Sequence, residues 1–327
     1  MNEMSGVGSH TPDGGKASRA AKRLLPSPLG PGRILRAMDR LEHTTALDGV
    51  IDLIRDKIRA APLGSLRDVL HGRPLGHPAH PLLVQVPLGS WLSAAVLDLL
   101  PGQRRAACVL IGVGLGTAGP AAVAGWVDWA ELQQRHRRVG FVHAAANITA
   151  VALYAASLTA RVRGRARLGR TLGFAGLSTV GIGGAIGGHL AYRQASGANH
   201  AEAVQDLVKP GWHGIGTVVD FPVGRAVRRS IDDVPVAVVR ESGEQVHVLA
   251  DMCSHLGGPL SSGEVTDGCV RCPWHGSVFR LSDGWNVRGP ATAAQPSFET
   301  RIIGGRVEAR LRGQEPDGSE GEAAPRD

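Results

Sequence analysis

Two short segments near the C-terminal end of the sequence each combine one cysteine with one histidine. The first reads Cys253-Ser254-His255 and the second reads Cys272-Pro273-Trp274-His275, with residues 256–271 between them. Together they offer two thiolates and two imidazoles. This is the ligand set of a [2Fe–2S] cluster in which two Cys hold one iron and two His hold the other. Glycine and proline in both segments let backbone N–H groups approach an anionic cluster closely.

A structural zinc site is the alternative, because tetrahedral zinc accepts the same atoms. Zinc sites usually pair Cys with Cys and His with His, however, whereas each segment here mixes the two residue types. The other two cysteines have simpler interpretations. Cys108 lies in an apolar run and is expected to be a small buried hydrophobe. Cys269 forms C-x-x-C with Cys272, and we interpret it as a strand residue facing a small core, with a redox or metal role left open.

The residues around both segments resemble the two cluster-binding loops of the Rieske ferredoxin family. Cys253 through Leu260 and Cys272 through Phe279 carry this resemblance, which extends over about residues 213–312. It includes the closing Gly289-Pro290 loop and the final strand pattern Phe298 through Ile303. The resemblance implies one [2Fe–2S] cluster per chain, held by Cys253, His255, Cys272 and His275.

The sequence departs from the high-potential members of that family in both loops. Gly258 and Trp274 stand where quinol-oxidising complexes carry an extra pair of cysteines, so the disulfide of those loops is absent. Ser277 matches a family serine that donates a hydrogen bond to the cluster, whereas Phe279 stands where those members have tyrosine. We therefore expect a low to intermediate potential within the Rieske range of about −150 to +300 mV.

Four apolar stretches of about 20 residues, the length that crosses a bilayer as a helix, occupy the first two-thirds of the chain. Asp98 is the only Asp, Glu, Lys or Arg within them, and short connectors rich in arginine join them. The sequence therefore predicts four transmembrane helices. They run over Pro81–Leu100, Ala106–Val127, Phe141–Ala160 and Thr171–Tyr192.

The remaining segments complete the predicted organisation, which is multidomain: an all-α four-helix transmembrane bundle followed by an all-β Rieske iron–sulfur domain. The tails are expected to be disordered, and the segment before the first span shows the periodicity of amphipathic helices lying near the membrane surface. The predicted boundaries are a tail at 1–32, amphipathic helices at 33–72, the four-span domain at 73–195, a linker at 196–212, the Rieske domain at 213–312 and an acidic tail at 313–327.

Residues 66–205 also resemble a bacterial family of four-helix membrane domains whose activity is uncharacterised. Four segments carry this resemblance: Leu75 through Pro81, Gly125 through Asp128, Arg138 through His143 with Asn147, and Gly187 through Tyr192. It implies the topology of the bundle and no particular chemistry.

Histidines gather at one level of the predicted bundle. His80 precedes the first span, His143 begins the third and His189 lies near the end of the fourth. An up-down arrangement therefore places all of them on the side of the Rieske domain. Ionisable groups at membrane depth are candidates for function, so our hypothesis is a haem b or metal site, or the border of a quinone pocket. Interfacial anchoring, with histidines capping helix ends or pairing with Asp128, is the alternative.

The charge distribution indicates a lipid bilayer and excludes a nucleic-acid partner. The net charge is +7, but aromatic residues make up only 4% of the chain, and the arginines flank apolar runs. An even number of spans places both ends of the chain on one face. The basic N-terminal segment lacks an export signal, and iron–sulfur clusters are assembled in the cytoplasm, which favours a cytoplasmic Rieske domain. The Arg and Lys counts on the two faces are equal, so they favour neither orientation.

Electron transfer is the chemistry that the two cluster loops indicate. We expect a carrier that moves one electron between a soluble reductase or ferredoxin partner and a membrane acceptor, haem or quinone. A redox sensor that uses the cluster without turnover is the alternative. An oxygenase requires a large domain with mononuclear iron held by two His and a carboxylate, and residues 276–327 are too few for one. We therefore expect an oxidoreductase component without a catalytic site of its own.

Overall fold

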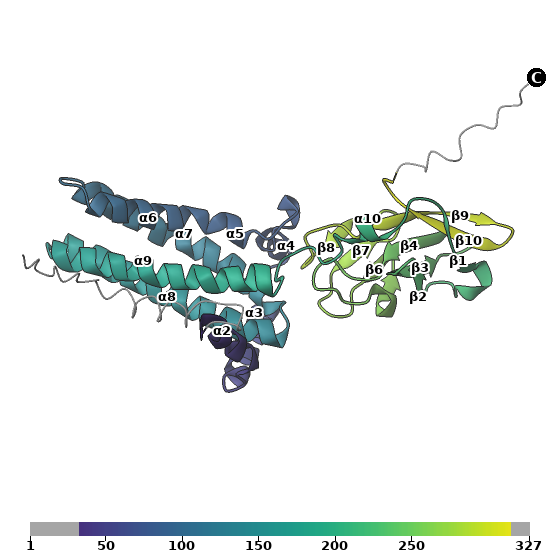
Figure 1. Ribbon diagram of the computed structural model, residues 1–327, viewed down its shortest axis with the longest axis horizontal. Helices are drawn as coiled ribbons and strands as arrows, with labels where there is room; N and C mark the ends of the chain where they lie inside the picture. The colour runs from purple at the N-terminus through teal and green to yellow at the C-terminus, as the bar shows by residue number, and fades with distance from the viewer. Residues whose placement is uncertain (1–32, 315–327) are drawn as a thin grey trace, which may run out of the picture.

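The computed structural model describes residues 33–314, so the tails expected at 1–32 and 315–327 lie outside the described residues. A helical bundle comes first along the chain, and a β-domain follows at one end of it (Figure 1). The multidomain fold predicted from the sequence, all-α and then all-β, is confirmed.

Within residues 33–314, four helical segments are long and apolar enough to cross a membrane. The first consists of two consecutive helices, and the last continues through a π-helical turn into Arg193. The four predicted spans are confirmed, and the last three extend beyond their apolar stretches at both ends. The elements are α5 (His80–Leu83) with α6 (Gln85–Asp98), α7 (Arg104–Ala130), α8 (Gln134–Val162), and α9 (Ala166–Gly188) with η2 (His189–Arg193).

The bundle is built from two helix pairs. Helix α6 packs along α7 and helix α8 packs along α9, so that the pairs form two layers (Figure 1). Trp91 of one pair stacks on Tyr154 of the other, with ring centroids 4.3 Å apart. At the end far from the β-domain, buried Asp98 forms an ion pair with buried Arg161. The two layers are thus joined by specific contacts along a seam.

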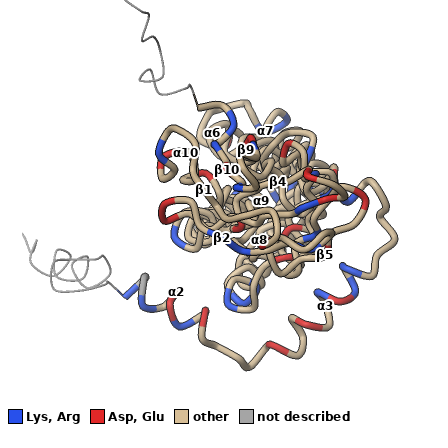
Figure 2. Tube along the Cα trace, turned by 90° about the vertical axis from the view of Figure 1, so that its right-hand side faces the viewer, with Lys and Arg blue, Asp and Glu red and all other residues tan. Residues whose placement is uncertain are grey.

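Two amphipathic helices, α2 (Arg33–His43) and α3 (Asp48–Ala60), lie against the end of the bundle that faces the β-domain (Figure 1). Ile51 of α3 is 1% exposed and packs with Trp129 and Leu132. Figure 2 shows this segment running around the outside of the bundle. Two short elements, α4 (Leu66–Leu70) and η1 (Arg73–Leu75), then lead into the first span.

The β-domain consists of two antiparallel sheets. The six-stranded sheet has the order β1-β10-β9-β4-β3-β2, and the four-stranded sheet has the order β5-β6-β7-β8. The strands are β1 (His213–Thr217), β2 (Ala226–Ile231), β3 (Val234–Arg240), β4 (Val246–Ala250), β5 (Glu264–Thr266), β6 (Cys269–Arg271), β7 (Val278–Arg280), β8 (Asn286–Arg288), β9 (Ser297–Ile303) and β10 (Arg306–Leu311). Short helical turns interrupt them at η3 (Val218–Asp220) and η4 (Leu260–Ser262).

The segment between the bundle and the first strand also packs on the β-domain. It contains α10 (Val204–Leu207), and Ala201, Val204 and Val208 are buried in the same apolar core as residues of β3 and β10. Because these side chains are 0–3% exposed, the segment is part of the folded β-domain, although it precedes the first strand.

Candidate metal centre and its contact with the membrane domain

The two Cys/His segments fold into the same kind of turn. The Cys253 N–H donates to the Gly258 carbonyl at 2.9 Å, and the Cys272 N–H donates to the Ser277 carbonyl at 2.8 Å. In each turn the glycine four residues after the cysteine donates back to the cysteine carbonyl. These glycines, Gly257 and Gly276, have φ values of +76° and +77°, in the left-handed region that glycine adopts at no steric cost. The spacing of the motif is therefore the spacing of this turn.

The turns bring all four predicted ligands together. The thiols of Cys253 and Cys272 are buried and hydrogen-bond to one another. The imidazole centroids of His255 and His275 are 5.0 Å apart. Within residues 33–314, no three His, Cys, Asp or Glu side chains converge as a single ion requires. The sulfur pair and the nitrogen pair therefore suit the two irons of a [2Fe–2S] cluster better than one tetrahedral zinc ion.

The surroundings prepare these groups as ligands. The hydrogen bond from Cys253 lowers the pKa of Cys272 to about 6, and the same bond, with burial, raises the pKa of Cys253. Burial lowers the pKa of His275 to about 4 and holds the pKa of His255 well below its usual value. Both imidazoles are consequently neutral near pH 7, the state in which they bind metal.

Ser277 closes the Cys272 turn, Phe279 follows it in β7, and both side chains are fully buried. The Ser277 hydroxyl oxygen accepts the Ala291 N–H at 3.0 Å, which leaves its own O–H to donate in another direction. Phe279 packs in the apolar core that includes both cysteine ligands. The half-buried Cys269 stands in β6, and burial raises the pKa of its thiol. No disulfide joins the four cysteines of the chain, all of which lie in the described part.

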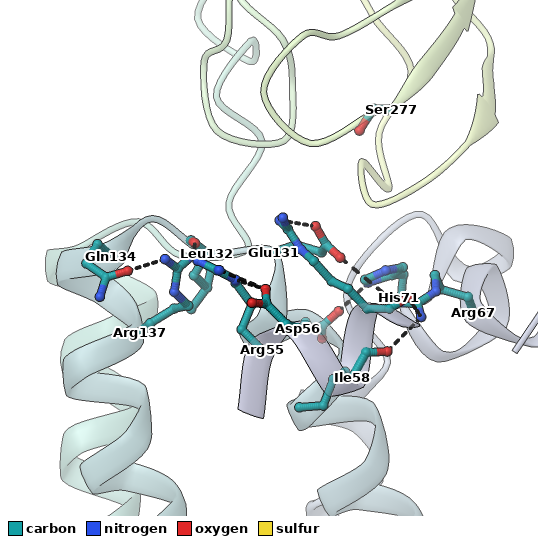
Figure 3. A network of polar contacts seen from close by, with 12 residues as sticks. Arg55, Asp56, Ile58, Arg67, His71, Glu131, Leu132, Gln134, Arg137 and Ser277 are labelled. Atoms are coloured by element: carbon teal, nitrogen blue, oxygen red, sulfur yellow. Dashed lines mark hydrogen bonds and ion pairs between the residues drawn. The ribbon is translucent and has the colours of Figure 1, made fainter. Parts of the chain in front are cut away.

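The turns face the end of the membrane domain, as the position of β7 and β8 beside α4 indicates (Figure 1). Leu256 is 6% exposed and lies in one apolar cluster with Ile51, Trp129 and Leu132. Polar contacts surround this apolar one. The Gly289 N–H donates to Asp68 at 3.0 Å. At the same end, Glu131 forms ion pairs with Arg59 at 2.7 Å and with Arg67 at 3.9 Å (Figure 3).

A cleft of about 490 Å³ lies between the turns and the membrane domain. Trp274 and His275 line it on one side, and His71, Arg67 and Glu131 line it on the other. Figure 3 shows the loop of Ser277 above this network, in which Arg59 pairs with Glu131 at 2.7 Å and Arg67 donates to the Ile58 carbonyl at 2.9 Å. One predicted ligand is therefore accessible from a polar cleft at the membrane-domain end.

His71 is a residue of this cleft that no motif in the sequence indicates. It is 2% exposed, and its Nδ1 lies 2.8 Å from Oδ1 of Asp128. The only signal for this pair was Asp128 itself, at the end of the Gly125-Trp126-Val127-Asp128 motif. His71 follows an amphipathic segment and belongs to no motif, so nothing local distinguished it.

The structure brings together two of the three membrane histidines. The rings of His80 and His143 have centroids 6.1 Å apart. His189 points elsewhere, with its Nε2 3.3 Å from Oε1 of Glu42. One form of the anchoring alternative paired a membrane histidine with Asp128. In the structure, the Asp128 carboxylate is instead hydrogen-bonded to His71.

Both halves of the chain have counterparts among known proteins. Residues 211–299 match the family described as Rieske [2Fe-2S] domain, and residues 76–200 match the family described as Predicted membrane protein (DUF2231). The anthranilate 1,2-dioxygenase ferredoxin subunit of Burkholderia cepacia is 33% identical over 100 residues, which cover 31% of this chain and 92% of that protein. The two family resemblances noted in the sequence are confirmed.

Longer relatives share only the β-domain part. Apoptosis-inducing factor 3 of Mus musculus is 37% identical over 79 residues, which cover 24% of this chain and 13% of the relative. The oxygenase component of 3-ketosteroid-9-alpha-monooxygenase from Rhodococcus rhodochrous is 31% identical over 94 residues, which cover 29% of this chain and 23% of the relative. The chain thus spans nearly all of the ferredoxin subunit and a minor part of these two proteins.

Proposed function

Since the chain belongs to the Rieske [2Fe–2S] family through residues 211–299, we propose that it is a membrane-anchored electron carrier. It takes one electron from a soluble reductase or ferredoxin and delivers it to an acceptor, haem or quinone, in the membrane. The observation that carries this proposal is the docking of the cluster turns on the membrane domain. Leu256 is buried against Trp129, and His275 shares a cleft with His71.

In this proposal Cys253 and Cys272 hold one iron, and His255 and His275 hold the other. When bound, the cluster accepts and releases one electron. The protein keeps both imidazoles neutral through burial and supplies backbone N–H groups to both sulfurs. The Ser277 hydroxyl, oriented by the Ala291 N–H, adds one further donor.

The open side of the cleft suits the electron donor. Trp274 is 48% exposed beside the buried ligands. Arg271 and Arg288 are exposed and line the same cleft, and neither has an ion-pair partner among residues 33–314. A positive rim of this kind attracts an acidic protein surface and speeds its association. We therefore expect an acidic reductase or ferredoxin to bind here.

The β-domain is proposed to lie on the cytoplasmic side of the membrane. The bundle of four membrane-length helices brings both ends of the described chain to the same face. Cluster assembly takes place in the cytoplasm, as does the chemistry of soluble reductases. A cysteine-accessibility assay with a membrane-impermeant reagent on Ser230→Cys, an exposed position of β2, tests this orientation in right-side-out and inverted vesicles.

The ligand assignment is tested by iron and acid-labile sulfide content together with the EPR spectrum of the reduced, detergent-purified chain. We expect Cys253→Ser, His255→Ala, Cys272→Ser and His275→Ala each to abolish the cluster signal. Cys269→Ser is the matched control and should retain it, because Cys269 begins β6 and lies before the turn that starts at Cys272. A full cluster in any of the four ligand variants contradicts the assignment.

The transfer function is tested in nanodiscs that contain ubiquinone, with NADH and a flavin-dependent ferredoxin reductase as the donor system. We expect cluster-dependent reduction of a membrane acceptor, lost in Cys272→Ser and retained in Cys269→Ser. If the cluster is full and the reductase reduces it, but neither quinone nor any chain-bound haem is reduced, the carrier proposal is wrong and the sensor alternative takes its place.

A further inference from the structure

His80 and His143 face one another across the seam between the two helix pairs. His80 begins α5, on the α6–α7 side, and His143 lies in α8, on the α8–α9 side. Their ring centroids are 6.1 Å apart and their planes are nearly perpendicular, at 82°. Each ring is therefore supplied by a different layer of the bundle.

A backbone carbonyl of its own layer orients each ring. His80 Nδ1 lies 2.8 Å from the Ala121 carbonyl oxygen, and His143 Nδ1 lies 2.8 Å from the Gly183 carbonyl oxygen. An imidazole that donates from Nδ1 to a carbonyl has its lone pair on Nε2, which is the arrangement of metal-bound histidines. Within residues 33–314, His80 Nε2 has no hydrogen-bond partner. The amide nitrogen of Asn147 is almost equidistant from both nitrogens of His143, so it lies over that ring and leaves the in-plane lone pair available.

Glycines on the neighbouring helix of the same layer, α7 for His80 and α9 for His143, make room for both rings. A Cβ on Gly125 would lie 2.8 Å from Nδ1 of His80, and a Cβ on Gly187 would lie 3.0 Å from Cε1 of His143. A Cβ on Gly183 would lie 2.9 Å from the Asn147 amide. Any side chain at Gly125 or Gly187 would push an imidazole out of place, so two separate helices are adapted to this one pair.

Two histidines suit a haem better than a free metal ion. No third His, Cys, Asp or Glu converges on the pair in the described part of the chain, and two protein ligands hold a bare cation weakly. A haem brings four nitrogen ligands of its own and needs only two axial ones. With metal–imidazole bonds of about 2 Å, two axial imidazoles place their ring centres about 6 Å apart. The observed 6.1 Å agrees with this distance.

We propose that His80 and His143 are the axial ligands of one haem b, bound in the seam between the two helix pairs. This inference rests on the proposed function and names its membrane acceptor. In the transfer, the reduced cluster loses one electron and the ferric haem iron gains it and becomes ferrous, with no proton or leaving group involved. His143 stands nine residues inside α8, about 13 Å from the end of the bundle that faces the cluster.

The test uses the full chain, produced in cells supplied with a haem precursor and also titrated with haemin after purification. We expect one haem per chain by pyridine haemochrome assay, with the optical and EPR spectra of a six-coordinate low-spin iron. His80→Ala and His143→Ala should each abolish that spectrum, and added imidazole should restore it. Two other histidines serve as controls and should retain it: His77→Ala, in the segment that leads into α5, and His189→Ala, in η2.

Three further variants separate loss of the ligand from loss of the fold. His80→Met and His143→Met each keep a haem ligand and should shift the low-spin spectrum without abolishing it. Gly125→Ala should weaken haem retention by displacing His80, whereas Gly119→Ala adds its Cβ in open space and should not. A wild-type chain that binds no haem, or low-spin haem retained in both alanine variants, overturns the inference.

The cluster and quinone assays on the same preparation keep the two proposals distinct. A chain without haem whose cluster still reduces quinone leaves the carrier function standing and removes only the haem site. If the reductase reduces the cluster but the bound haem stays oxidised, the proposed transfer from the cluster to the haem is wrong, although the haem site exists.

Discussion

Trp274 packs directly against Gly258, one from each cluster turn. A Cβ on Gly258 would lie 3.0 Å from Cγ and Cδ2 of the indole and 3.0 Å from Sγ of Cys272. These are the two positions at which the sequence lacks the cysteine pair of high-potential relatives. The two turns are therefore held against one another by the packing of an indole on a glycine, where those relatives use a covalent bond.

We predict that Gly258→Ala damages the cluster site. The added methyl group overpacks the contact between the turns, which typically destabilises by about 1–3 kcal/mol. Iron and sulfide per chain should fall, and the Tm of the β-domain should decrease. Gly214→Ala in β1 is the control, since its Cβ would meet no atom within 4 Å. Unchanged cluster content and Tm in Gly258→Ala would mean that the turns adjust freely.

We predict that Ser277→Ala lowers the reduction potential of the cluster. The Ser277 oxygen already accepts the Ala291 N–H at 3.0 Å, so its hydroxyl proton points away from that bond, and we expect it to donate to a cluster sulfur. A hydrogen bond to a charged group contributes about 1.5–3 kcal/mol, which for a one-electron couple corresponds to roughly 60–130 mV at most. Redox titration followed by EPR measures the change. Ser230→Ala, on the exposed side of β2, should leave the potential unaltered.

Composition and local spacing predicted the elements of this protein well, for physical reasons. A span of apolar residues decides on its own whether a helix can cross a bilayer, so all four spans were identified. The turn of Cys253 and that of Cys272 are closed by hydrogen bonds within six residues. All the residues that form each turn are therefore neighbours in the sequence, and the motif includes them.

Contacts between distant segments were not predictable in the same way. His71 meets Asp128 across 57 positions, and Arg161 meets Asp98 across 63. Each of these depends on how a helix is rotated about its axis, which apolar composition does not determine. The same limit applies to the membrane histidines: their common level followed from the topology, but the rotation that joins His80 to His143 and sends His189 to Glu42 did not.

We predict that Leu256→Asp separates the cluster turns from the membrane domain while leaving the cluster in place. Leu256 is buried against Ile51, Trp129 and Leu132, and burial of a leucine side chain contributes about 1.5–3 kcal/mol. Hydrogen exchange in residues 196–212 and in α3 should increase, and electron delivery to the membrane acceptor should slow. Val219→Asp, at an 86% exposed position of the β-domain, is the control. Unchanged delivery in Leu256→Asp would show that docking is not required for transfer.

We predict that the docking of α3 on the bundle weakens in acid. The hydrogen-bonded Arg138 guanidinium, 2.6 Å away, lowers the pKa of the Asp48 carboxyl. A carboxyl with a lowered pKa in the folded state stabilises at a pH above its unfolded value, about 3.9, and this stabilisation is lost as the pH falls through the folded value. Hydrogen exchange in α3, corrected for the intrinsic rate, should therefore stay constant from pH 7 to pH 5 and rise below pH 4. Asp48→Asn should show the increased exchange already at pH 7.

We predict that the buried pair of Asp98 and Arg161 holds the two helix layers together at the end far from the cluster. Their side chains are 5% and 2% exposed, and Arg161 also donates to the Ser157 hydroxyl at 3.2 Å. Removing one partner leaves an uncompensated buried charge, which typically costs about 3–5 kcal/mol, whereas removing both charges costs much less. Thermal unfolding in detergent should therefore show a lower Tm for Arg161→Met and for Asp98→Leu than for the double variant. Arg163→Met, two residues along the chain and exposed, should change the Tm little. A double variant that is less stable than both single variants would mean that the pair stabilises the bundle through its own attraction and not by neutralising a charge that folding has buried.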